Sequence, residues 1–552
     1  MIMVNQLSAL FRIRPFVSQR SVITASALGL FFIIVIGPLA GLAIDLVRLI
    51  LSGAASASFL SLFAERRIIL LLQSTLLAAA VASAGILTGV LISTAIWRKP
   101  AGISFMVLLV VLALAPIPPY IHALTWSSAI ALFNQGLAIA GAAPLPATGW
   151  AAGFWVQFMA LLPVAVFLSF IALASVDRSL VEAARTMRSD TDVLRSIVLP
   201  LAAPTLAAAF GFLFILSCTD YSVPSLFGAD TFALDIFSSY SASGSAASAL
   251  VASVPLLLIT FAVMAWCHAG IRNLAQTPNW TAASWDSPPE FPLPVRLAQE
   301  GSLALLGIQV LVIFLGLSFT SGSLQQVGSA LRFSAPEIRN TLVIAVCAVL
   351  IAIPLALAVS RELIREDWRG KLWWGLVLLP VAVPAPLIGI GLISIWNNSA
   401  AAGIYGSFLM PVFASVSRFA PFAAIILFVQ LRSLDPSLFD AARVFSRSRI
   451  HSLLQVTLPL LAPGLLVASA LLSVLTFGEL GATLIVTPPG FSTLAIKVYN
   501  YLHYGAAHEV AGLCLVMVVV TLAAGLCVVA AEVRRQRVFR TCATKPPEEN
   551  AC

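Results

Sequence analysis

VEAARTMRSDTDVLRSIVLPLAAP (Val181–Pro204) and FDAARVFSRSRIHSLLQVTLPLLAP (Phe439–Pro463) are two charged segments of nearly the same sequence within a strongly apolar chain. Each contains an acid-Ala-Ala-Arg run and continues to a Leu-Pro pair that opens a long apolar stretch. Self-similarity at a large fixed separation is typical of an internal repeat. The chain is therefore predicted to be duplicated, with one charged segment in each half.

The composition is that of a membrane protein. Of 552 residues, 60% are hydrophobic and only 10% are charged, and the mean hydropathy is +1.01. These values lie far outside the range of soluble domains. A spanning helix needs about 20 mainly apolar residues. The sequence thus predicts an all-α membrane protein with about twelve transmembrane helices, at residues 22–43, 68–95, 103–124, 150–175, 197–218, 247–270, 299–320, 340–360, 371–395, 405–431, 456–477 and 508–532.

Basic residues are distributed unevenly between the two sides of these spans. With the N-terminus placed in the cytoplasm, the loops richest in Lys and Arg and the basic C-terminal tail all face the cytoplasm, as the positive-inside rule requires. The exceptions expected on the outer side are Arg48, Arg66, Arg67, Arg332, Arg339 and Lys497. The net charge of +8 is explained by basic loops beside the anionic lipid bilayer, so no nucleic acid partner is expected.

The spans divide into two halves related by the repeat. Asp177 aligns with Asp435 and Pro163 with Pro421, so both halves run in the same orientation. A stretch rich in Pro, Trp and polar residues separates them. The predicted domains are residues 1–272, a first repeat of six helices, residues 273–298, a linker, and residues 299–552, a second repeat of six helices with a basic tail.

Each charged segment can form a short amphipathic helix. Apolar residues recur at helical spacing, at Leu180, Ala183, Ala184 and Met187 in the first copy and at Leu438, Ala441, Ala442 and Phe445 in the second. Two small alanines let a helix approach a partner's groove closely, and neighbouring charges orient it. The alternative is a pair of ordinary basic loops made alike by gene duplication. Retention of Ala-Ala-Arg and Leu-Pro in both copies favours a docking role.

The pattern of an acid, two alanines and a downstream Leu-Pro in a cytoplasmic loop resembles the EAA loop of prokaryotic ABC importer permeases. Its occurrence in two copies resembles the fused ferric-iron permeases and their thiamine, phosphonate and polyamine relatives. The likeness covers essentially the whole chain, including the closing ELGATLIVTPPGFSTLAIKVYNYLHYGA (Glu479–Ala506). The resemblance implies two coupling helices, each entering a cleft on an ATPase subunit, formed by Glu182, Ala183, Ala184 and Arg185 with Pro200 downstream, and by Asp440, Ala441, Ala442 and Arg443 with Pro459 downstream.

The two loops depart from the family pattern and from each other. The usual glycine is replaced by Arg188 in the first loop and by Ser446 in the second, and Asp440 stands in place of the usual glutamate. The first loop is also one residue shorter than the second. The two docking sites are therefore expected to be unequal.

The sequence contains no motif for a nucleotide or metal site. It has no Gly-x-x-x-x-Gly-Lys-Ser/Thr loop, which cradles ATP phosphates. Its seven cysteines show neither metal-ligand spacing nor a disulfide framework. The chain is expected to be no enzyme and to bind no cofactor or metal. The resemblance implies ATP on partner subunits, two ATPase copies, a periplasmic solute-binding protein, the bacterial inner membrane and, as leading substrate, ferric iron.

Two carboxylates occupy equivalent positions at the ends of spans five and eleven. Asp220 lies twenty residues after Pro200, and Glu479 lies twenty residues after Pro459. Ionisable groups at membrane depth tend to face an aqueous path. Asp220, its neighbour Tyr221 and Glu479 are therefore candidates for the outer mouth of a pathway that favours a cationic or metal-bearing substrate. The alternative is that both carboxylates lie in water at helix ends.

Prolines predict that two spans are broken. Spans three and nine contain Pro116, Pro118, Pro119, Pro380, Pro384 and Pro386. Broken helices are tolerated where neighbouring helices or a cavity satisfy the freed backbone groups. The two segments are candidates for the pathway or for a hinge, with packing kinks as the alternative.

A second function class is an ion-coupled secondary transporter, which also has twelve helices in two similar halves. Such a carrier would not need paired Ala-Ala-Arg helices, and it should carry buried charges within its spans, which spans five and eleven lack. Arg418 falls in an apolar run and is expected near the outer end of a shorter span ten. An intramembrane enzyme is a third class, but no His-Glu-x-x-His or Gly-x-Ser-x-Gly pattern occurs.

Overall fold

The computed structural model describes residues 22–52, 64–276, 287–445, 449–504 and 507–544. Within these ranges the chain is helical and contains no strand, so the predicted fold class is confirmed. The first half comprises α2 (Val22–Phe31), η1 (Phe32–Ile36), α3 (Gly37–Leu51), α5 (Glu65–Arg98), α6 (Ala101–Leu114), α7 (Pro119–Ile139), α8 (Trp150–Ala174), α9 (Arg178–Arg185), α10 (Asp190–Val193), η3 (Leu194–Val198), α11 (Leu199–Thr219), α12 (Ser222–Leu226), α13 (Phe232–Ser243) and α14 (Ala246–Gln276).

The second half follows the same order of elements. It comprises α15 (Leu293–Thr320), α16 (Leu324–Phe333), α17 (Ala335–Leu363), α18 (Trp368–Leu378), η4 (Leu379–Ala382), α19 (Ala385–Trp396), η5 (Ser399–Ala401), α20 (Ala402–Tyr405), α21 (Leu409–Arg432), α22 (Pro436–Phe445), α23 (Arg449–Ser452), η6 (Leu453–Thr457), α24 (Leu458–Phe477), α25 (Thr483–Val486), α26 (Leu494–Tyr504) and α27 (Ala507–Thr544). The short helices α9 and α22 thus hold equivalent places, as do α13 and α26.

The candidate membrane spans lie where the sequence predicts them. Ten helical segments of the described chain are long and apolar enough to cross a membrane, and two bent helix pairs raise the number to as many as twelve. The bent pairs are spans three and nine: α6 meets α7 at 105°, and α18 with η4 meets α19 at 107°. Pro118 and Pro384 precede the second helix of each pair. Proline removes a backbone donor and clashes with the preceding turn, so the two predicted breaks are confirmed.

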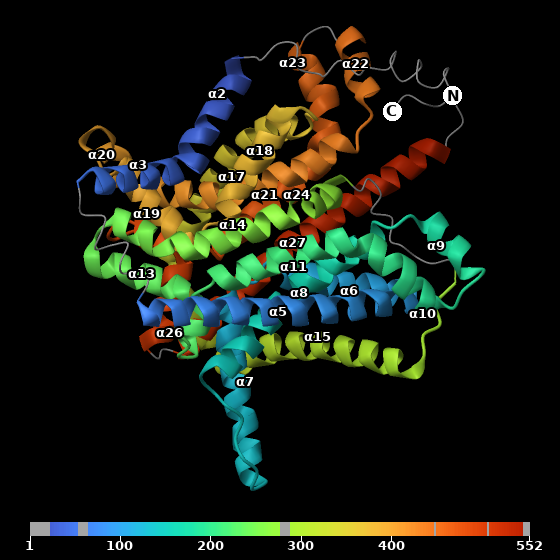
Figure 1. The fold of residues 1–552 in the computed structure, drawn as a ribbon, viewed down its shortest axis with the longest axis horizontal. Coiled ribbons are helices and arrows are strands. Elements are labelled where there is room, and N and C mark those ends of the chain that lie inside the picture. The colour runs from blue at the N-terminus through green and yellow to red at the C-terminus, as the bar shows by residue number, and fades with distance from the viewer. Residues whose placement is uncertain (1–21, 53–63, 277–286, 446–448, 505–506, 545–552) are drawn as a thin grey trace.

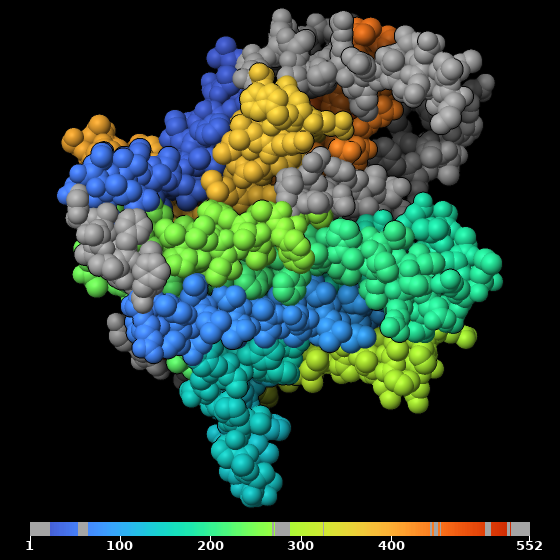
Figure 2. Space-filling view, in the orientation of Figure 1, coloured from blue at the N-terminus to red at the C-terminus, as the bar shows by residue number. Residues whose placement is uncertain are grey.

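The longer arm of span three leaves the bundle. Figure 2 shows α7 projecting from the body of the molecule, roughly across the direction of the neighbouring spans in Figure 1. Its outer turns expose Leu132, Phe133 and Ile139. No Asp, Glu, Lys or Arg occurs between Lys99 and Asp177. This arm therefore carries no charged side chain.

Small residues bring the central helices of each half close together. In the first half α5 packs against α8 and α11, and in the second half α17 packs against α21 and α24. A Cβ atom on Gly89 would lie only 2.7 Å from the backbone oxygen of Ala165 on α8. Without a hydrophobic driving force between helices in lipid, close backbone approach through small residues supplies the contact.

The first helix of each half packs against the other half. α15 lies along α5 and α7, and α3 lies along α19. Polar side chains hold α15 in place: Gln299 accepts a hydrogen bond from Arg98 (2.7 Å), and Gln309 accepts one from Trp126 Nε1 (2.7 Å). The two halves are therefore interlocked rather than side by side.

Gly391→Ala should weaken this interlock. A Cβ atom at Gly391 on α19 would lie 2.3 Å from the backbone oxygen of Pro38 on α3. Because backbone cannot move aside as a flexible side chain can, we expect a destabilisation of about 1–3 kcal/mol, measured by thermal unfolding in detergent. The matched control is Gly375→Ala in the same broken span, where no atom lies within 4 Å. Equal unfolding temperatures for the two variants would contradict the close α3–α19 contact.

Helical structure extends into both ends of the predicted linker at residues 273–298. α14 continues to Gln276, and α15 begins at Leu293. Two of the five prolines in this stretch, Pro292 and Pro294, stand immediately before and within the first turn of α15. Proline fits there because its missing N–H has no helical partner. The domain boundaries themselves stay a prediction.

Candidate functional site

The two Ala-Ala-Arg segments form helices α9 and α22, which Figure 1 places toward the same side of the molecule, opposite α13, α20 and α26. An aspartate caps each helix. Asp177 accepts the backbone N–H of Ser179 (2.8 Å), and Asp435 accepts that of Ser437 (2.9 Å). Hydrogen bonds from the same serines lower the pKa of both carboxyl groups. The caps are thus fully formed at neutral pH and are lost only as the pH falls through the lowered pKa values.

Each helix buries one large apolar side chain. Val181 of α9 is buried with Trp97, Leu173 and Val193, and Phe439 is buried at the equivalent position of α22. In contrast, four large apolar side chains at equivalent positions are exposed, by the fractions given in parentheses: Leu180 (47%), Met187 (87%), Leu438 (44%) and Phe445 (86%). Ala183 and Ala441 lie exposed among them. The helix α22, and α9 together with the turn that follows it, therefore each have an exposed apolar surface that includes an alanine.

The structure describes the side chains of four other predicted coupling residues, on Ala184, Glu182, Arg185 and Asp440. Ala184 packs against the cluster around Val181, and Glu182 is half-buried. The side chain of Arg185 is only 12% exposed and turns back onto Asp190, with Nε to Oδ1 at 2.7 Å. Asp440 is exposed. The side chains of Ala442 and Arg443 lie outside the described residues.

Pro200 and Pro459 stand in the first turns of α11 and α24, directly after the π-helical turns η3 and η6. A proline clashes with the carbonyl group four residues earlier. A widened turn at that point relieves the clash while the helix continues. The Leu-Pro pair therefore gives both halves the same wide turn between the short helix, α9 or α22, and the following span.

Asp220 ends α11 and is held by neighbours in its own half. Its Oδ1 accepts from the backbone N–H (2.9 Å) and hydroxyl (2.6 Å) of Ser222, and Oδ2 accepts from Gln157 Nε2 on α8 (3.3 Å). Gln157 also bonds to Ser217 on α11 through its amide oxygen (2.8 Å). The carboxylate is thus fixed between α8 and the turn after α11.

Glu479 follows α24 and is buried, with 3% of its surface exposed. One oxygen accepts the backbone N–H of Ala482 (2.7 Å), and the other pairs with Arg418 of α21. Arg418 is the tenth residue of α21, which begins at Leu409, so the expectation that it stands near the outer end of a shorter helix is wrong. A buried carboxylate provides the counter-ion that makes the position tolerable.

The two carboxylate segments meet where the halves face each other. The ring of Tyr221 stacks on Phe237 (centroids 5.8 Å apart), and a Cβ atom on Gly481 would lie 3.8 Å from the Tyr221 ring. The Tyr221 hydroxyl is buried without a hydrogen-bond partner. Arg418, which pairs with Glu479, lies at the same junction, so Glu479 does not present a free negative charge.

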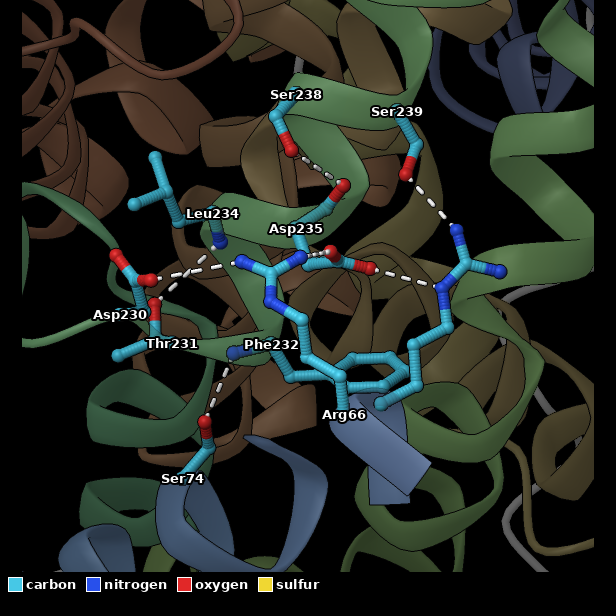
Figure 3. A network of polar contacts seen from close by, with 10 residues as sticks. Arg66, Ser74, Asp230, Thr231, Phe232, Leu234, Asp235, Ser238 and Ser239 are labelled. Atoms are coloured by element: carbon cyan, nitrogen blue, oxygen red, sulfur yellow. Dashed lines mark hydrogen bonds and ion pairs between the residues drawn. The ribbon is translucent and has the colours of Figure 1, made fainter. Parts of the chain in front are cut away.

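Ion pairs neutralise most of the exceptions to the positive-inside pattern. Asp235 on α13 pairs with Arg66 at the start of α5 (3.2 Å), as Figure 3 shows. It also pairs with the next residue, Arg67 (3.1 Å). In the second half the signs are reversed: the base Lys497 lies on the short helix α26, and its partner Glu337 lies at the start of the span α17 (3.0 Å). Both Asp235 and Lys497 are the fourth residue of their helix.

Among the described residues, no group of three or more His, Cys, Asp or Glu side chains could hold a metal ion.

A duplicated helical bundle with an equivalent exposed helix in each half defines a fused membrane permease with two related domains. The chain belongs to the family of binding-protein-dependent transport system inner membrane components, whose sequence model matches twice, at residues 85–273 and 348–536. The predicted family and the predicted duplication are thereby confirmed. Membership of this transport family also favours a permease over an ion-coupled carrier or an intramembrane enzyme.

Several permeases are similar to parts of the chain. A Haemophilus influenzae protein named as a ferric transport system permease is 27% identical over 334 residues, which make up 56% of this chain and 52% of that protein. The ferric transport system permease protein of Actinobacillus pleuropneumoniae is 26% identical over 338 residues, 56% of this chain and 48% of that protein. The chain thus spans about half the length of these relatives.

Relatives with other substrates are similar as well. The molybdate/tungstate transport system permease protein of Thermococcus kodakarensis is 25% identical over 232 residues, which cover 41% of this chain and 89% of that protein. Permeases named for different solutes are therefore similar in sequence to this chain.

Proposed function

We propose that this chain is the permease subunit of an ABC importer that moves ferric iron from a periplasmic binding protein to the cytoplasm, driven by ATP hydrolysis on separate subunits. The observation that carries the proposal is the pair α9 and α22, which expose the same apolar positions on one side of the molecule. In this proposal that side is cytoplasmic, and both chain termini are cytoplasmic too.

Each of the two helices would enter a cleft on one ATPase subunit, so one chain would recruit two copies. Apolar side chains such as Met187 and Phe445 would fill the cleft, and the exposed alanines Ala183 and Ala441 would allow close approach. Nucleotide-driven movement of the ATPases would then shift the permease between inward-open and outward-open packings. The interlocked first helices would make the two halves move together.

The ferric substrate is supported by the two ferric permeases among the relatives. Asp220 and the unpaired hydroxyl of Tyr221 supply oxygen atoms at the junction of the halves. A second candidate is an oxyanion such as a phosphonate or molybdate. It is favoured by Arg418, whose cation lies at the same junction, and by the molybdate/tungstate relative.

Uptake by proteoliposomes separates these substrates. The chain is reconstituted with its ATPase and binding protein, and accumulation of ferric iron, 2-aminoethylphosphonate or molybdate is measured with ATP inside. We expect saturable, ATP-dependent accumulation of ferric iron alone. Accumulation of an oxyanion instead would contradict the ferric assignment. Uptake that needs an ion gradient but no ATP would contradict the ABC importer.

A further inference from the structure

The segment that joins the two halves contacts the first candidate coupling helix. Arg185, the last residue of α9, donates through Nη1 to the backbone oxygen of Ser287 (3.2 Å). The backbone N–H of Glu290 donates to Oδ2 of Asp190 (2.6 Å). Residues 287–292 lead directly into α15, so these two bonds tie α9 to the beginning of the second half.

Asp190 lies at the centre of this contact. Arg185 donates to it through Nε (2.7 Å, to Oδ1) and through Nη2 (3.3 Å, to Oδ2). Both side chains are only 12% exposed. A two-pronged, partly buried arginine–carboxylate pair holds its geometry better than an exposed pair does. We call the side chains of Arg185 and Asp190, together with the backbone of Ser287 and Glu290, the clasp.

Two further polar contacts connect α15 with the end of α5 in the first half. Glu300 on α15 pairs with Lys99 (2.8 Å), and Gln299 bonds to Arg98 at the end of α5. The carboxylate of Asp190 thus connects α9, through the joining segment and α15, with α5. The first coupling helix is attached to elements of both halves.

The second loop has a different residue at the corresponding place. Asp190 lies ten residues before Pro200, whereas Arg449 lies ten residues before Pro459. An arginine side chain has no hydrogen-bond acceptor. A clasp built on a carboxylate at this position can therefore form only in the first loop.

We infer that Asp190 is a positioning residue that fixes the first coupling helix against the joining segment, through a carboxylate contact that the second loop cannot form. The inference rests on the proposed function, because it assigns α9 a partner in an ATPase cleft. It adds that the two ATPase contacts are mechanically unequal, and it names the residue responsible.

Site-specific photo-crosslinking tests the clasp in the assembled complex of the full chain with its ATPase. A photoreactive amino acid replaces either Leu180 on α9 or Leu438 on α22, which are both exposed. Asp190→Asn keeps the size of the side chain but removes its charge and one acceptor. We expect it to lower the crosslinking yield at position 180 about tenfold, as loss of a charge-assisted hydrogen bond allows, and to leave the yield at position 438 unchanged.

Glu290→Pro is a second variant that leaves both clasp side chains intact. It removes the backbone N–H that binds Asp190 together with the glutamate side chain, whereas its control Glu290→Ala removes the side chain and keeps the N–H. The control for Asp190→Asn is Asp192→Asn, because Asp192 is exposed on the same short helix and its carboxylate accepts from Ser189 (2.7 Å). We expect Glu290→Pro to reproduce the selective loss at position 180 and both controls to match the parent.

Three results would overturn the inference. Unchanged yields at position 180 in both Asp190→Asn and Glu290→Pro would show that the clasp does not position α9. An equal fall at positions 180 and 438 would show a general loss of structure instead. Absence of crosslinks at both positions in the parent chain would contradict the proposed function, and the role of Asp190 with it.

Discussion

Ala183→Glu combined with Ala441→Glu is expected to abolish association with the ATPase and all ATP-dependent transport. Both alanines lie exposed among the apolar side chains of α9 and α22. A docked helix would bury the new carboxylates in an apolar cleft without a counter-ion. Because an uncompensated buried charge costs several kcal/mol, the affinity of each contact should fall by roughly 100-fold or more. Co-purification and stimulated ATP hydrolysis measure the loss.

The alanines at 183 and 441 are better targets than their neighbours. Ala184 packs inward against the cluster around Val181, so a charge there would also damage the fold of α9. The matched control is Ser196→Glu combined with Gln455→Glu, which adds the same charges at exposed positions of η3 and η6, beyond the two helices. We expect the control to retain assembly. Intact assembly in the alanine variant would contradict docking through α9 and α22.

Arg418→Met is expected to destabilise the protein by about 3–5 kcal/mol, since it leaves the buried carboxylate of Glu479 without its partner. The reason is that Glu479 is 3% exposed and keeps only the backbone N–H of Ala482 as a donor among the bonds described here. Adding Glu479→Leu removes the orphaned charge, and the double variant should return to within about 1 kcal/mol of the parent. Thermal or chemical unfolding in detergent measures the difference.

Arg48→Met serves as the control for this cycle. Arg48 also pairs with a carboxylate, that of Asp45 (3.2 Å), but its side chain is 75% exposed. Exposed pairs contribute at most about 1 kcal/mol, so the control should unfold near the parent. An Arg418→Met variant as stable as Arg48→Met would show that Glu479 is not held by Arg418.

Much of the site could be predicted from local sequence. The Ala-Ala-Arg repeats identified α9 and α22, and the same repeats located Asp220 and Glu479 by counting from Pro200 and Pro459. Apolar run lengths located the spans, and Pro118 and Pro384 marked both helix breaks. These features follow from the residues within one segment, because hydropathy, helix periodicity and proline geometry act over a few turns.

Other features depended on segments far apart in the chain. Arg418 carried a sequence signal as a lone charge in an apolar run, but its partner Glu479 follows a different span. The clasp joins Asp190 to Glu290, and no local pattern links them.

The sequence by itself determined an all-helical, duplicated membrane permease with two equivalent charged helices. Hydropathy and helical periodicity within short segments indicate the helices, and the repeated segments indicate the duplication. Only the tertiary structure decided that α3 and α15 each pack against the other half, that Arg418 pairs with Glu479, and that Asp190 binds the segment joining the halves. The physical reason is that close packing and buried charge pairs form between different helices. Which helices become neighbours therefore depends on small residues and counter-ions that lie far apart in the sequence.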